Sequence, residues 1–134
     1  PPPPPPFFLL IRRPPIPSLF PYTTLFRSML QAHPDITGIF CADGDRTLGA
    51  YVACQANNRQ DVLIAGYDAT PEQKEIMQQD GAECNMICAT NLHPDNLGKL
   101  STEIAYKILE GEEVPEITMS DIDLMKAEDV AAGK

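Results

Sequence analysis

Three residues with hydrogen-bonding side chains, Asp43, Asp68 and Asn91, each lie within two residues of the end of a short apolar run. An ionised carboxylate accepts two or more hydrogen bonds, whereas a neutral amide both donates and accepts them. Brought together, such groups could form hydrogen bonds to a small ligand. Polar residues in these places also cap the helices that follow strands, and Asp45 and Thr70 are suited to that structural role. The residue types alone leave both roles open.

The elements that would position these residues are apolar runs of strand length that alternate with helical patterns. Strands are predicted at 37–42, 61–66 and 85–89, with a half-buried fourth strand around 117–124. Helices are predicted at 45–57, from Thr70 onward with Gln73 in a capping box, and at 94–110 with an apolar stripe of Leu97, Leu100, Ile104 and Ile108. This alternation indicates an α/β fold with a doubly wound, mainly parallel sheet that is covered on both faces. In such sheets the ligand lies beyond the carboxyl ends of the strands.

Charge divides the 134-residue chain into two unequal parts. Residues 1–28 hold ten of the fourteen prolines, three arginines and no acidic residue, whereas residues 29–134 hold all nineteen acidic residues against seven Lys and Arg. An acidic segment without a basic stripe argues against binding to nucleic acid, because phosphates are neutralised by clustered Lys or Arg. The foldable part is also short for a complete two-layer binding protein or enzyme, so we expect an incomplete domain with a small or protein partner.

The first 28 residues do not read as a folded segment. Their apolar run at 7–11 is too short for a membrane span or for the core of a signal peptide. Residues 7–28 resemble instead the conceptual translation of sequencing-adapter DNA. We therefore expect residues 1–28 to be disordered and non-native, and the true N-terminal part of the protein, with any export signal, to be missing.

No residue pattern predicts catalysis or a metal site. Cys84 and Cys88 are four residues apart on a predicted strand, about 13 Å, which is too far for a disulfide. Cys41 and Cys54 are predicted to be small buried groups. His33 and His93 stand singly in loops. The aspartates could form a magnesium or phosphoacceptor pocket, as in receiver domains, but the accompanying lysine is missing. We expect a binding protein rather than an enzyme, without cofactor or metal.

Several segments in order resemble one known family. They are residues 30–40, Leu48-Gly49-Ala50, residues 61–72, Gly98-Lys99-Leu100 and residues 109–115. Together they look like the second half of a sugar-type periplasmic binding protein, near the ribose-binding branch. The resemblance covers almost all of residues 29–134, although no single motif in it is decisive.

This resemblance implies a two-lobed receptor that closes over a sugar and delivers it to the membrane permease of an ABC-type importer, outside the cytoplasm. On that template residues 29–90 belong to the C-terminal lobe. Residues 91–116 form a crossover and a helix of the N-terminal lobe, and residues 117–126 are the returning strand. The complete protein is expected to be a monomer, and this portion alone is not expected to close over a ligand.

The resemblance also assigns three ligand contacts. The family's polar residue after the first strand falls on Asp43, its Gly-aromatic-Asp aspartate on Asp68, and its crossover amide on Asn91, for which His93 competes. Asp43 replaces the usual amide. Its carboxylate would favour a ligand with a positive group, such as an amino sugar, or would pair with Arg46 and leave the ligand neutral.

The main alternative is the effector-binding core of a LacI-type transcription regulator, which has the same fold. Regulators of that type usually have a longer segment before the second strand and a second aspartate after the Gly-aromatic-Asp motif. Here only residues 57–60 intervene, and Ala69 follows Asp68. Both differences favour the transport receptor.

Overall fold

A four-stranded sheet in the order β1-β2-β3-β4 organises the chain in the computed structural model, which describes residues 19–133. Its strands are β1 (Gly38–Phe40), β2 (Leu63–Tyr67), β3 (Met86–Asn91) and β4 (Asp123–Lys126). The first three run parallel, and β4 pairs antiparallel with β3. The predicted α/β fold with a mainly parallel sheet is confirmed.

One helix follows each parallel strand, as the sequence pattern predicts. These helices are α2 (Gly44–Ala56), α3 (Pro71–Asp80) and α4 (Pro94–Leu109), and two short helices, η2 (Gly81–Glu83) and α5 (Ala127–Ala131), were not expected. The predicted capping box of α3 is present, because the Thr70 side chain accepts from the Gln73 N–H and the Gln73 side chain accepts from the Thr70 N–H. Among residues 19–133, no helix has both the length and the apolar character needed to cross a membrane.

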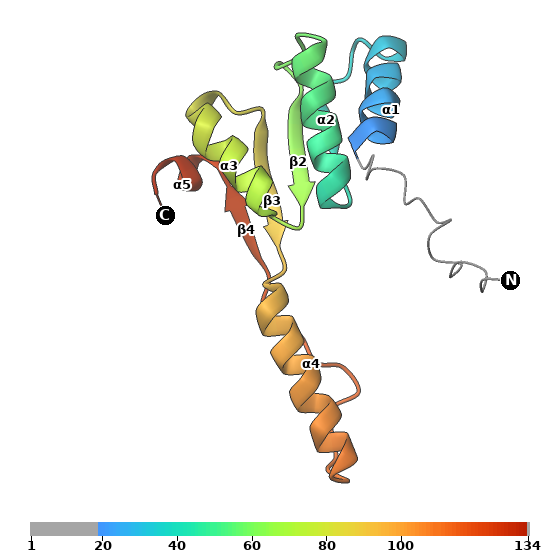
Figure 1. Cartoon of the computed structure of the whole chain (residues 1–134), viewed down its shortest axis with the longest axis vertical. Helices are drawn as coiled ribbons and strands as arrows, with labels where there is room; N and C mark the ends of the chain where they lie inside the picture. Colours follow the sequence, from blue (N-terminus) through green and yellow to red (C-terminus); the bar gives the residue numbers. More distant parts are fainter. Residues whose placement is uncertain (1–18, 134) are drawn as a thin grey trace, which may run out of the picture.

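Residues 19–28 depart from the expected disorder. The structure places Leu19–Ala32 in a helix, α1, which lies against α2 (Figure 1). Phe26 and Leu30 are buried one turn apart on this helix, and Tyr22 packs against the same core. A side chain at Gly49 would meet the Tyr22 Cβ at 2.6 Å, so the glycine lets the two helices approach. The expectation of disorder overlooked this helical stripe; residues 1–18 lie outside the described part of the chain.

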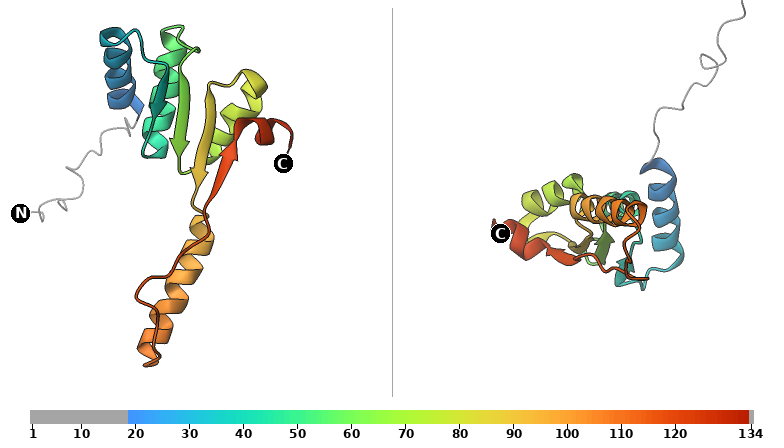
Figure 2. Two further views of the ribbon diagram at one scale, coloured as in Figure 1. Left: turned by 180° about the vertical axis from the view of Figure 1, so that it is seen from behind. Right: turned by 90° about the horizontal axis from the view of Figure 1, so that it is seen from below.

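Helices cover one face of the sheet, where two were expected. Ile39, Ile64 and Ala89 point to the covered face and are buried. On the opposite face, within the described residues, Phe40 is 69% exposed, Leu63 49% and Leu124 50%. The view from behind shows the strands in front of α2 and α3 (Figure 2). The apolar strands do have two apolar faces, as predicted, but residues 19–133 provide a helical layer for one of them.

Helix α4 extends away from the sheet (Figure 1), and none of its residues is buried. Its predicted apolar stripe is partly exposed, with Leu97 at 43% and Ile108 at 56%. The chain then runs back beside α4 before β4 begins at Asp123 (Figure 2). The fourth strand therefore starts later than predicted, because pairing with β3 is possible only where the chain has returned to the sheet.

The exposed sheet face predicts binding of an apolar dye. We expect the 134-residue chain to enhance the fluorescence of 8-anilinonaphthalene-1-sulfonate. Replacing Phe40 and Leu124 together by Ser should lower that signal about twofold, because contiguous apolar patches provide the binding surface. Leu25→Ser, at a residue 52% exposed on α1, is the matched control and should change it little. Equal signals from all three proteins would contradict an apolar face at Phe40 and Leu124.

Burial of cysteine thiols predicts a loss of stability at alkaline pH. Cys41 and Cys54 are buried, as predicted, and burial raises the pKa of Cys41 from 9.0 to about 11. The unfolded thiol ionises near 9 while the folded one keeps its proton, so the contribution of Cys41 is complete below pH 9 and is lost as the pH rises towards 11. At pH 10 the loss is about 1 kcal/mol. Urea unfolding at pH 8 and pH 10 measures it, and Cys41→Ala should show a smaller decrease; parallel decreases would contradict the assignment.

Candidate functional site

The carboxyl ends of β1, β2 and β3 lie at one edge of the sheet, because the three strands are parallel. Asp68 directly follows β2, and Asn91 is the last residue of β3. Both line one cavity of about 390 Å³, whose other lining residues are Ala69, Thr70, Pro71, Leu92 and Pro94. The structure thus brings two of the three predicted contacts together at the edge where α/β proteins bind ligands.

The Asp68 carboxylate is oriented by a backbone hydrogen bond. Its Oδ2 accepts from the Gly44 N–H at 2.8 Å. Asp68 and Ala69 both have left-handed backbone conformations, with φ of 74° and 45°, so the chain turns sharply after β2. This conformation is unfavourable for residues other than glycine, and it is typical of functional loops. One carboxylate oxygen is fixed, and within the described part of the chain the other has no partner.

Gly44 was not among the predicted site residues. A Cβ at this position would lie 2.7 Å from the Thr70 Cγ2 and 3.4 Å from the Asp68 Oδ2. A side chain here would therefore push apart the two strand-end loops, that is, the loop after β1 and the loop after β2. The sequence signal was the glycine between two aspartates directly after a strand, but its partner Asp68 is 24 residues away.

Asp43 serves α2 in the structure. Its Oδ1 accepts from the Arg46 N–H at 2.8 Å, and its Oδ2 forms an ion pair with the Arg46 guanidinium. The guanidinium also lies over the Tyr22 ring, 5.0 Å from its centre. The pairing of Asp43 with Arg46 that the sequence left open is present, and Asp43, rather than Asp45, is the residue that caps α2. Asp43 does not line the cavity that Asp68 and Asn91 share.

Asn91 and His93, the two candidates for the crossover contact, lie next to each other. The Asn91 Oδ1 accepts from the His93 N–H at 3.2 Å, and its Nδ2 lies 3.4 Å from the ring nitrogens. The His93 Nε2 is 3.0 Å from the Asp123 carboxylate on the returning strand. His93 is thus half-buried and paired, whereas Asn91 lines the cavity with Asp68. The geometry favours Asn91 as the residue that meets a ligand.

A buried threonine joins the first two loops at their base. The Thr47 hydroxyl donates to the Asp43 carbonyl at 2.7 Å and accepts from the Tyr67 N–H at 3.4 Å. Thr47 is completely buried, and a Cβ at Gly66 would lie 2.5 Å from its methyl group. The absence of a side chain at Gly66 therefore permits the close approach of α2 to β2.

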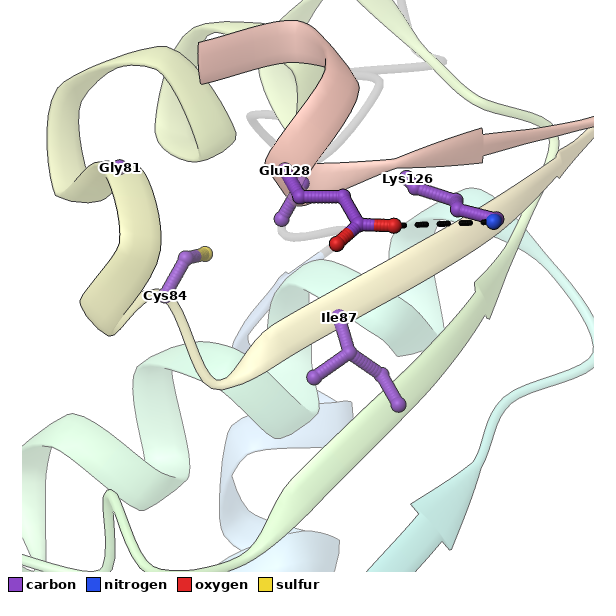
Figure 3. Close-up of a pocket in the computed structure, with 6 residues that line it drawn as sticks. Gly81, Cys84, Ile87, Lys126 and Glu128 are labelled. Carbon is purple, nitrogen blue, oxygen red and sulfur yellow. Dashed lines mark ion pairs between the residues drawn. The ribbon is translucent and has the colours of Figure 1, made fainter. Parts of the chain in front are cut away.

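Two other hollows contain neither Asp68 nor Asn91. A cavity of about 400 Å³ lies near the start of β3, at the opposite edge of the sheet, with Cys84, Ile87 and the Lys126–Glu128 ion pair of 3.6 Å in its wall (Figure 3). Burial raises the pKa of the Cys84 thiol, which favours its neutral form. A larger hollow of about 710 Å³ is lined by residues of α4 alone. Among residues 19–133, no three His, Cys, Asp or Glu side chains are grouped to hold a metal ion.

Comparison with known proteins matches the fold and the sequence to one family. The family described as "Periplasmic binding protein domain" matches residues 23–113. The ribose import binding protein of Salmonella typhimurium is 33% identical over 90 residues, which are 67% of this chain and 29% of that protein. The D-apiose import binding protein of Paraburkholderia graminis is 30% identical over 70 residues, 52% of this chain and 21% of that protein.

Solved structures agree with this assignment. An ABC transporter solute-binding protein from Mycobacterium smegmatis with bound glycerol has a TM-score of 0.73 and 32% identity, covering 83% of this chain and 38% of that one. A second one from Actinobacillus succinogenes with bound D-allose has a TM-score of 0.74 at 23% identity, covering 85% and 40%, and supports the fold. The chain spans less than a third of the length of its curated relatives. The predicted resemblance is confirmed: this chain belongs to the periplasmic binding protein family.

Proposed function

We propose that this chain is part of a solute-binding protein that captures a sugar or similar polyol for an ABC-type importer. The observation that carries the proposal is the position of Asp68 and Asn91 on one cavity at the carboxyl ends of parallel strands. The names of the relatives support it, because they are import binding proteins for ribose and apiose, and solved relatives hold glycerol or D-allose. Reversible binding of this kind requires no chemical step, so we propose no enzymatic activity.

The two side chains divide the recognition of hydroxyls between them. The free Asp68 oxygen accepts hydrogen bonds from ligand hydroxyls, while the Gly44 N–H holds the other oxygen in place. The Asn91 amide can donate to a ligand oxygen and accept from a ligand hydroxyl. A carboxylate that is already oriented loses little further freedom when the ligand binds, which favours affinity.

We further propose that the ligand is uncharged. Two acidic residues, Asp43 and Asp68, were predicted to contact the ligand, and the Arg46 guanidinium neutralises Asp43. The other carboxylate oxygen of Asp43 accepts a hydrogen bond from the Arg46 N–H in the first turn of α2. Of these two acids, only Asp68 then keeps an oxygen without a partner among the described residues, and neutral hydroxyls can donate hydrogen bonds to it. The ion pair therefore favours a neutral sugar over an amino sugar.

The remaining assignments follow the family's two-lobed plan and are proposals too. Residues 29–90 would belong to one lobe and α4 to the other, with the connection at 91–93 and the returning segment before β4 as parts of the hinge. The exposed stripe of α4 would then pack within the second lobe. Closure of both lobes over the sugar would present the complex to a membrane permease outside the cytoplasm. The complete receptor would act as a monomer.

Removing the Asp68 carboxylate tests the proposed site. In the full-length protein, Asp68→Ala should weaken binding of the tightest ligand among D-ribose, D-allose and glycerol by at least tenfold, about 1.4 kcal/mol. The reason is the loss of a charged acceptor for hydroxyls. Isothermal titration calorimetry measures the dissociation constants. The control is Asp35→Ala, at an exposed aspartate that precedes β1 and does not line the cavity.

Three results would contradict parts of this proposal. Undiminished affinity in Asp68→Ala would remove Asp68 from the site. Tighter binding of D-glucosamine than of every neutral sugar would show that the ligand carries a positive charge. A helix-turn-helix upstream of Met29 would favour a transcription regulator over a transport receptor.

A further inference from the structure

We propose that Gln73 is a positioning residue that holds the two strand-end loops together and thereby keeps the Asp68 carboxylate in its orientation. Gln73 lies on α3, is completely buried and does not line the cavity. It would therefore act on a ligand only through the loops. The importance of that orientation for a sugar rests on the proposed function, whereas the hydrogen bonding itself does not.

The Gln73 carboxamide connects backbone groups on both sides of Asp68. Its Nε2 donates to the Tyr67 carbonyl at 2.9 Å and, through a longer contact of 3.5 Å, towards the Gly44 carbonyl. Its Oε1 accepts from the Thr70 N–H at 3.2 Å. One amide thus bonds the residue before Asp68, the residue two positions after it, and the loop that donates to its carboxylate.

Helix capping explains only one of these contacts. In a capping box the side chain at this position accepts from the N-cap N–H, which the Gln73 Oε1 does. A solvated glutamate could do the same without burial. The Nε2 contacts lie outside α3 and are made to two carbonyl oxygens, which a glutamate could only repel. Because a buried amide is unfavourable unless it is hydrogen-bonded, the burial of Gln73 indicates a specific match to these two loops.

The contacts of Gln73 support the bond that fixes Asp68. Gly44 donates its N–H to the Asp68 Oδ2, while its carbonyl faces the Gln73 Nε2. Gln73 therefore contacts Gly44, whose N–H donates the hydrogen bond, and Tyr67, the last residue of β2 before Asp68, whose carboxylate accepts it. Without the amide, the left-handed turn at Asp68 and Ala69 would lose the hydrogen bonds that Gln73 makes to the residues on either side of it, Tyr67 and Thr70.

Amide hydrogen exchange measured by NMR on the unliganded 134-residue chain tests this inference. Gln73→Met keeps the length of the side chain and removes its hydrogen bonds. We expect protection of the Gly44 N–H to fall at least tenfold, while the Ile64 N–H, which bonds the Asn85 carbonyl at 2.7 Å within the sheet, keeps its protection. Gln78→Met, at an exposed glutamine on the same helix, should change neither amide.

The comparison of Gly44 with Ile64 separates positioning from general stability. Equal losses at both amides would make Gln73 a purely structural residue and overturn the proposal, as would unchanged protection at Gly44. The wild-type chain gives a second test that does not depend on folding of the variant: the Gln73 carboxamide protons should exchange at least tenfold more slowly than those of Gln78. Equal rates would overturn the proposal. No ligand is used, so failure of the sugar-binding proposal in calorimetry would be a separate result.

Discussion

The hydrogen bond from the Gly44 N–H to the Asp68 carboxylate is the interaction on which the candidate site depends. It joins the loop after β1 to the loop after β2 and exists only because both backbones come unusually close. The loops can approach because Gly44 has no side chain to meet Thr70. At the base of the loops, α2 can approach β2 because Gly66 has no side chain to meet Thr47. A parallel sheet brings its strand ends to one edge in any α/β protein, but these contacts turn the edge into an oriented acceptor beside Asn91.

Residues around Asp68 also take part in capping the helices that follow β1 and β2. Asp43, Thr70 and Gln73 each take part in capping the start of a helix, and Gln73 also donates to the Tyr67 carbonyl next to Asp68. The caps of α2 and α3 therefore lie next to the loops that hold Asp68. The Arg46 ion pair removes Asp43 as a competing charge. A single free carboxylate oxygen and one amide remain for recognition.

Local sequence patterns predicted most of the fold, since strands, helices and the Thr70 capping box depend on neighbouring residues. They placed Asp68 and Asn91 at strand ends, because strand ends can be located from apolar runs, whereas the assignment of these two residues as ligand contacts came from the family resemblance and stays a prediction. They did not predict the bond of Gly44 to Asp68, 24 residues away, or the contact of Gln73 with the Gly44 carbonyl, 29 residues away. Helix α1 was missed because the composition of residues 1–28 outweighed the stripe of Tyr22, Phe26 and Leu30. The uncovered sheet face was not predicted, because apolar runs show that a strand has two apolar faces but not which of them a helix covers.

A crystal structure of the full-length protein bound to a neutral sugar tests the central claim most directly. The account predicts that one sugar hydroxyl lies within hydrogen-bond distance of the Asp68 Oδ1 and that another group of the sugar contacts the Asn91 amide. The Gly44 N–H should remain bonded to the Asp68 Oδ2, as in the unliganded chain. A sugar bound elsewhere, with Asp68 and Asn91 both free of it, would contradict the account.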